Sequence, residues 1–403
     1  MSAGAVSMDR GARVESRWIE DNAAWREPDE VGAGRRRADP VGRGLLEVRV
    51  RGGWWETLER LDACVVVSRE YEHLLLALAV APEGPQQSFM SLPHPSGLTF
   101  DARAQRLHVA STRNPNQLYV LAPAMGRNAG GRGAIAGDRP LVPLSVSFLP
   151  GRLYLHDLAL IGGVLHGNAV GLNAVVRLNG PGQCEPVWWP RAIERDGRPD
   201  ISRNYLQLNS IAAGEELSRS FFSASTDAPA HRRPGHRNFP VDGRGVIFSG
   251  ATREPVVRGL TRPHSARLRN GELWVDDSGY GRLAVIRDCR PETVASLPGW
   301  TRGLAFAGNV AFVGTSRVIP RFAQYAPGLN VDRSVCAVHA LDVGSGEALG
   351  SVSWPNGNQV FDIAVLPRSA TLGFAALAGR RQSRRELSSF FFSYDTSNLA
   401  GTP

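Results

Sequence analysis

Two histidines and one arginine occupy the same position in a motif that recurs along the chain. His156 begins H-D-L-A-L, His264 begins H-S-A-R-L, and Arg302 begins R-G-L-A-F. Because histidine exchanges protons near neutral pH and neutral imidazole binds metals, both histidines are candidate acid–base catalysts or ligands of a divalent metal. A guanidinium group binds carboxylate or phosphate, so Arg302 is a candidate anion-binding residue. The alternatives are structural: the histidines hydrogen-bond across a channel, or Arg302 pairs with Asp157 or Asp277.

The motif consists of one residue that is usually polar, one small or acidic residue, and a short apolar β run. We call its first residue the lead residue, and the six lead residues are Ser96, His156, Asn209, His264, Arg302 and Phe361. The residues directly after them are 60, 53, 55, 38 and 59 positions apart. The shortest spacing fits one four-stranded propeller blade, and the longer ones leave room for loop insertions. The sequence therefore predicts an all-β fold, a six-bladed β-propeller.

The sixth blade requires both ends of the repeat region. Three β runs, at about 62–69, 73–80 and 86–91, precede the first motif, whereas one clear strand follows Phe361. Pairing these N-terminal strands with that C-terminal strand would close the ring and protect the sheet edges.

Propeller geometry predicts where a site would form. The innermost strand of each blade begins at one mouth of the central channel, and the loop between the second and third strands returns to that mouth. These loops contribute Arg113, Asn114, Asn168, Asp227, Asp277, Ser278, Ser316 and Arg317. From the lead residues, their neighbours and these loops, the predicted ligand-binding residues are Asn209, Arg302, Asp277, Ser278, Arg113, Arg317 and His94.

Several polar residues near this mouth also have structural interpretations. Asp277 and Ser278 precede Gly279 and are typical of an Asx-type turn. Asp157 and Asp362 each follow a lead residue, so in a strand they point away from it. We expect their carboxylates to bond neighbouring backbone and order the blades.

Two long loops, at about 226–244 and 316–334, would lie over the same mouth. Long loops that contain glycine and proline suit either a lid or a surface for a specific partner.

Composition agrees with a turn-rich β protein. Of the 403 residues, 44 are Gly and 27 are Pro, and 42% are hydrophobic. No apolar stretch approaches the length of a membrane span and no secretory signal is visible, so we expect a cytoplasmic protein without membrane contact. The four cysteines, which are expected to be reduced and buried rather than zinc ligands, are Cys64, Cys184, Cys289 and Cys336.

The basic residues are unusual because all 46 are arginine, with a net charge of +8. No lysine is therefore available for a Schiff base. We interpret residues 1–55 as a disordered or loosely attached Arg- and Gly-rich leader, 56–375 as the propeller, and 376–403 as a C-terminal tail. Without a basic stripe that alternates with aromatic residues, nucleic-acid binding is not expected. The sequence contains no nucleophile motif or phosphate-binding loop in the strand–turn–helix setting that such motifs require. The Gly-rich segment 130–137 is not followed by a predicted helix, so it is not expected to bind phosphate.

Longer runs of the sequence resemble one known family. They are LYLHDLALIGGVLHGNAVGLNAVVRL, RGLTRPHSARLRNGELWVDDSGYGRL, LPGWTRGLAFAGNVAFVGTSR and VFDIAVLP. They are similar to a bacterial family of conserved hypothetical β-propeller proteins, a domain of unknown function sometimes found beside tetratricopeptide repeats. The likeness covers about residues 60–375. It implies the fold and the position of a site, but no reaction.

Together these features predict a propeller that binds a small polar or anionic ligand at one channel mouth. It would act as a lyase-, isomerase- or hydrolase-type enzyme through histidine acid–base or metal chemistry, with a divalent metal as the candidate cofactor. The alternative is a non-catalytic platform that binds a protein or peptide through its loops. The sequence predicts no oligomeric state.

Overall fold

The computed structural model describes residues 41–113, 116–124, 135–136, 139–149, 151–229, 232, 234–374, 376–377, 386–387 and 394–395. Most of the predicted leader and tail, the loop residue Asn114 and most of the Gly-rich segment 130–137 lie outside these residues.

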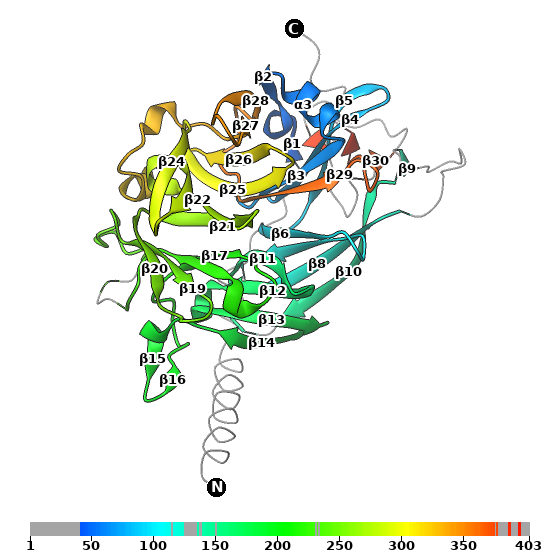
Figure 1. Cartoon of the computed structure of the whole chain (residues 1–403). Coiled ribbons are helices and arrows are strands. Elements are labelled where there is room, and N and C mark those ends of the chain that lie inside the picture. Colours follow the sequence, from blue (N-terminus) through cyan, green and yellow to red (C-terminus); the bar gives the residue numbers. More distant parts are fainter. Residues whose placement is uncertain are drawn as a thin grey trace.

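Six antiparallel sheets form a ring around a central axis, which confirms the six-bladed β-propeller (Figure 1). The first three blades, written from the innermost strand outward, are β29 (Asp362–Pro367), β3 (Ala63–Arg69), β4 (Leu74–Ala81), β5 (Gly84–Ser91) and β32 (Tyr394–Asp395); β6 (Pro95–Asp101), β7 (Arg106–Ser111), β8 (Asn116–Pro123) and β10 (Leu141–Leu149); and β11 (Leu155–Ile161), β12 (Val164–Ala169), β13 (Ala174–Gly180) and β14 (Gln183–Trp188). The other three are β17 (Leu208–Ala212), β18 (Phe221–Ala224), β19 (Gly245–Ser249) and β20 (Pro255–Leu260); β21 (Pro263–Arg269), β22 (Glu272–Asp277), β23 (Arg282–Arg287) and β24 (Arg290–Ser296); and β25 (Trp300–Ala307), β26 (Val310–Ser316), β27 (Ala337–Asp342), β28 (Ala348–Ser353) and β2 (Arg49–Gly52).

Short elements connect or flank the blades. The helices are η1 (Arg43–Leu46), α3 (Trp54–Arg60), η2 (Val170–Leu172), η3 (Arg191–Ile193), η4 (Leu217–Arg219), η5 (Ser278–Tyr280), η6 (Pro320–Tyr325) and η7 (Val331–Arg333). The paired short strands are β1 (Val41–Gly42) with β31 (Glu386–Leu387), β9 (Ile135–Ala136) with β30 (Ala376–Leu377), and β15 (Glu194–Arg195) with β16 (Arg198–Pro199). None of the helices in the described part of the chain has the length and apolarity needed to cross a membrane.

The first blade joins both ends of the repeat region, as predicted. β29 pairs antiparallel with β3, and Ile363 lies opposite Val67. Every residue of β3 and β4 is buried, because each blade of a propeller packs between two neighbours and both faces of the sheet are covered.

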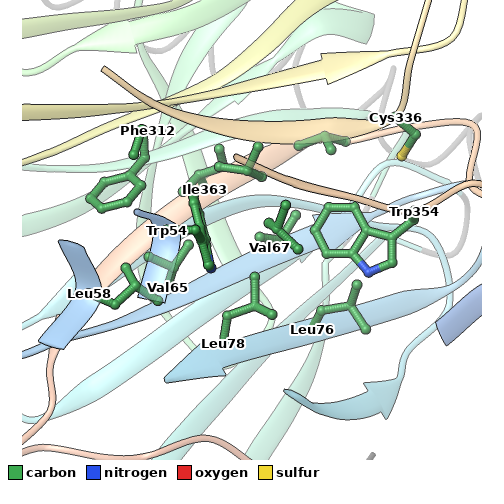
Figure 2. Close-up of a cluster of buried hydrophobic side chains, with 14 of the residues drawn as sticks. Trp54, Leu58, Val65, Val67, Leu76, Leu78, Phe312, Cys336, Trp354 and Ile363 are labelled. Atoms are coloured by element: carbon green, nitrogen blue, oxygen red, sulfur yellow. The ribbon is translucent and has the colours of Figure 1, made fainter. Parts of the chain in front are cut away.

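The segment before the first blade packs on the propeller. β2 adds a fifth strand to the outer edge of its blade by pairing with β28. Trp54 of α3 is fully buried and lies against Phe312 in an apolar cluster between the first and last blades (Figure 2). The described part of the predicted leader, residues 41–55, thus adjoins the propeller core, because its apolar side chains fill the space between two blades.

All four cysteines are free, as expected, but they differ in burial. Cys64 and Cys336 are buried, Cys184 is half-buried, and Cys289 is exposed. Cys289 departs from the expectation because it lies in the turn between β23 and β24, outside any sheet.

The residues that follow the lead residues join one blade to the next. At four junctions a side-chain oxygen accepts a hydrogen bond from a backbone N–H of the next blade. These bonds run from Leu98 to Asp362, from Ile211 to Asp157, from Ala266 to Ser210 and from Gly303 to Ser265, each with an N···O distance of 2.8 Å. The structural role expected for this position is therefore confirmed.

Glycine occupies the same position at the other two junctions. A Cβ atom on Gly97 would lie 2.6 Å from the Cα atom of Asp157, so only glycine permits this approach of two strands.

Arg267 of β21 bridges the blades at the axis. Its Nη1 lies 2.7 Å from Oδ2 of Asp157, and its Nη2 lies 3.2 Å from Oδ1 of Asp362. Its remaining donors reach the carbonyl oxygens of Ile211 and Leu304. One guanidinium group therefore connects innermost strands from five blades, counting its own.

Replacing Arg267 by Ala is expected to lower the free energy of unfolding by about 3–5 kcal/mol, because two buried carboxylates lose their counter-charge. Urea denaturation followed by tryptophan fluorescence measures the change. Arg177→Ala, which breaks an exposed pair with Glu185, is the control and should cost about 1 kcal/mol or less. Equal losses in the two variants would contradict the bridging role of Arg267.

Candidate functional site

A cavity of about 360 Å³ opens at the channel mouth where the lead residues begin. Five of the predicted site residues line it, namely His156, His264, Arg302, Arg113 and Arg317. Ser316 and the last lead residue, Phe361, line it as well. Four of the six lead residues therefore line this cavity, whereas Ser96 and Asn209 do not, and the predicted loop residues Asn168 and Asp227 do not line it either.

Two of the other predicted residues, Asn209 and Ser278, do not line this cavity because blade packing uses their polar groups. Asn209 Nδ2 donates to the carbonyl oxygen of Pro263 in the next blade at 3.0 Å. Ser278 Oγ donates to the carbonyl oxygen of Thr301 at 2.6 Å, which also crosses to the next blade.

Asp277 and His94 lie behind the cavity wall. Asp277 Oδ1 accepts a hydrogen bond from the backbone N–H of Thr261 at 2.6 Å, and burial raises the pKa of Asp277 to about 6. His94 is buried, with its Nδ1 3.5 Å from Oε1 of Glu70. Both residues therefore support the wall rather than form it.

Glu70 is a cavity residue that the sequence prediction missed. It lies directly after β3, in the second-to-third-strand loop of the first blade. Its Oε1 accepts a hydrogen bond from Thr112 Oγ1 at 2.7 Å and lies 3.4 Å from Nε of Arg113. The loop rule would have identified Glu70 once β3 was assigned as the second strand of the closing blade.

Glu70 remains a carboxylate over a wide pH range. Burial alone would raise its pKa, but His94, the charge of Arg113 and the Thr112 hydroxyl outweigh burial and lower the pKa to about 2.

A second missed group consists of residues that stand two positions before the lead residues. Most of them lie just before an innermost strand rather than in it. The members that line the cavity are Tyr154, Gln207, Arg262, Trp300 and Gln359. The backbone of His94, Tyr154, Gln207 and Arg262 is left-handed, with φ between 47° and 56°. The sequence analysis predicted His94 from this group but missed the five that line the cavity, because it began each motif at the lead residue.

The two histidines are neutral at physiological pH. Burial lowers the pKa of both well below the usual 6.5, and the charge of Arg302 lowers them further.

Their ring nitrogens have different partners. Nδ1 of His264 lies 2.8 Å from the carbonyl oxygen of Arg262 and 3.0 Å from Ser278 Oγ. A carbonyl oxygen only accepts hydrogen bonds, so Nδ1 of His264 carries the proton. Nδ1 of His156 lies 3.5 Å from Nη2 of Arg302, which only donates, so this nitrogen is the acceptor.

Arg302 lies flat against the ring of Phe361, with its Cζ atom 3.3 Å from the ring centroid. Burial lowers its pKa to about 10, so it remains a cation. Among the described residues, no carboxylate lies within 4.0 Å of this guanidinium, and Asp157 pairs with Arg267 instead. The predicted alternative of an internal pair with Asp157 or Asp277 is therefore not what the structure shows.

The surroundings of the histidines do not favour a metal ion. In the part of the chain that the structure describes, no three His, Cys, Asp or Glu side chains form a group that could hold one. Arg262 and Arg302 also place positive charge beside His156 and His264, and this opposes the binding of a cation.

Glu70 should make stability depend on pH. Its folded pKa lies below the unfolded value of 4.5, so its contribution is present above pH 4.5 and is lost as pH falls toward 2. We compare the free energy of unfolding of the wild type with that of Glu70→Gln at each pH. The difference between the two proteins should become smaller by roughly 2 kcal/mol when the pH falls from 5 to 3. Denaturant titrations across this range measure it, and parallel stability curves for the two proteins would contradict the assignment.

Several solved structures are distantly similar to this chain. A chain of a nidogen/laminin complex aligns over 75% of this chain and 97% of its own, with 10% identity and a TM-score of 0.48. A protein of unknown function from Bacteroides caccae aligns over 75% and 98%, with 9% identity and a TM-score of 0.44. Virginiamycin B lyase from Staphylococcus aureus aligns over 72% and 77%, with 11% identity and a TM-score of 0.37. Likeness this distant says nothing about what this chain binds or does.

A search of curated proteins gave no significant match. Residues 52–372 match the family described as Domain of unknown function (DUF4915). This range agrees with the resemblance noted in the sequence. The chain belongs to the DUF4915 family.

Proposed function

We propose that the cavity binds a small organic anion and that Arg302 holds the negative group. The observation that carries this proposal is a half-buried guanidinium with no carboxylate within 4.0 Å among the described residues. Its face is covered by Phe361 and one of its donors is directed to His156. The other N–H groups lie in the guanidinium plane, where a carboxylate or phosphate can accept two parallel hydrogen bonds.

The charge of the described lining supports an anionic ligand. Four guanidinium groups, those of Arg113, Arg262, Arg302 and Arg317, face one carboxylate, that of Glu70. Because the two histidines are neutral, the lining carries an excess of three positive charges.

Aromatic side chains favour a ligand with an apolar or planar body. Tyr71 and Phe322 stack at a centroid distance of 6.4 Å, and both line the cavity. Trp300 lies beside His264, with ring centroids 5.8 Å apart. A ligand between these rings would bury apolar surface while its anionic end reached Arg302.

Described residues of the two long loops line this cavity and pack on each other. Phe239 and Val241 of one loop form a buried cluster with Tyr325 of the other, and Phe322 and Trp300 pack against it. Phe239, Val241 and Tyr325 are buried by these contacts, which leaves them unavailable to a partner protein. This packing favours a small ligand beneath a lid over the alternative of a protein- or peptide-binding platform.

The same residues suit acid–base chemistry on the bound ligand. His264 Nε2 can accept a proton, while Arg302 and His156 stabilise negative charge by donating hydrogen bonds. We therefore propose lyase-, isomerase- or hydrolase-type chemistry as the catalytic form of this function, without a metal.

Phenylacetate should bind the wild-type protein in a calorimetric titration, whereas its neutral isostere phenylacetamide should not. Arg302→Gln should weaken phenylacetate binding at least about tenfold, because a charge-assisted hydrogen bond is lost. Arg177→Gln, which removes the same charge from an exposed site on β13, should bind like the wild type. Equal binding of the acid and the amide, or an unchanged affinity in Arg302→Gln, would refute the proposal.

A further inference from the structure

Most charged groups in the described cavity wall are hydrogen-bond donors, because four are guanidinium groups and one is a carboxylate. Arg302, Arg262 and the Nε2–H group of His156 can only donate hydrogen bonds to a ligand. Glu70 and Gln359 are acceptors in this wall: Thr112 and Arg113 already occupy Oε1 of Glu70, whereas Oε1 of Gln359 has no hydrogen-bond partner among the described residues. The lone pair on Nε2 of His264, whose imidazole lines the cavity close to the charge of Arg302, is a further acceptor.

The orientation of this lone pair follows from backbone geometry. Arg262 precedes His264 by two residues and has a left-handed backbone with φ of 56°. Its carbonyl oxygen holds Nδ1 of His264 at 2.8 Å, and Ser278 Oγ holds it at 3.0 Å. Both contacts fix the proton on Nδ1. Among the described residues Nε2 has no hydrogen-bond donor, and the imidazole lines the cavity.

A simple carboxylate cannot satisfy this wall completely. It has only acceptor oxygens, so it can take hydrogen bonds from Arg302 and His156 but cannot give one to His264. A polar group that is covered by a ligand and left without a partner costs binding free energy. The complementary ligand therefore carries a hydroxyl group close to its carboxylate.

We propose that the cavity selects small hydroxycarboxylates, with the carboxylate on Arg302 and the hydroxyl donating to Nε2 of His264. This inference rests on the proposed anion-binding function and names its ligand class. In this arrangement His264 determines specificity and Arg302 supplies affinity.

Three probes that share a phenyl ring and a carboxylate test the role of the hydroxyl. They are mandelate, 2-phenylpropionate, in which a methyl group replaces the hydroxyl, and O-methylmandelate, which keeps the oxygen but has no donor. Calorimetry at pH 8 should show mandelate binding the wild type at least about tenfold more tightly than either analogue, because only mandelate satisfies His264.

Two variants of His264 separate the ring nitrogens. In His264→Asn the side-chain NH₂ can still donate a hydrogen bond to the Arg262 carbonyl oxygen, but no acceptor replaces Nε2. Mandelate and its two analogues should therefore bind this variant with about equal affinity. In His264→Gln the amide reaches the position of Nε2 and its oxygen can accept, so part of the preference should return. Thermal unfolding verifies that both variants are folded.

The results distinguish the hydroxycarboxylate inference from the anion-binding proposal on which it rests. If none of the carboxylates binds the folded wild type, the anion-binding function fails and this inference fails with it. If all three bind the wild type equally, or if His264→Asn keeps the preference, anion binding stands and the hydroxycarboxylate inference is overturned. The comparison among wild-type affinities is decisive even if His264→Asn does not fold.

Discussion

The propeller depends on hydrogen bonds that cross from one innermost strand to the next. Sheets packed face to face can slide, because apolar contacts have little directional preference. A carboxylate or hydroxyl that accepts a backbone N–H from the neighbouring blade has one good geometry, so it fixes the register between blades. Arg267 then neutralises two of these carboxylates at once. Because lead residues directly precede this ring, the register of the blades also sets the positions of the cavity side chains.

Fold and site draw on alternate residues of the same strands. At four of the six motifs the lead residue lines the cavity, whereas Ser96 and Asn209 bond to the next blade. The residue after each lead residue lies against the adjoining blade. His156 and Asp157 illustrate the division, since one lines the cavity and the other binds Arg267 and Ile211. A substitution at either position therefore affects the other through the backbone that they share.

The sequence predicted the fold well because the motif repeats with the symmetry of the ring. The closing blade was predictable from the unequal number of strands at the two ends of the repeat region. Lining residues such as His156 and Arg302 followed from their place in the motif. Asn209 occupies the same motif position but is absent from the lining, because its amide bonds to Pro263. A repeated sequence motif does not reveal local hydrogen bonds of this kind. It also does not reveal the left-handed backbone conformation that brings Arg262 to the cavity.

Ring closure has a consequence for when the cavity can exist. Phe361, on which the Arg302 guanidinium rests, directly precedes β29, the strand that joins the two ends of the repeat region. During synthesis every other innermost strand emerges before this one, so the cavity is completed only when the first blade receives its inner strand. A chain that is incompletely synthesised, or in which β29 is not paired with β3, contains most of the lining residues but does not form the complete cavity. The ability to hold a ligand therefore belongs to the closed ring as a whole and to no single blade.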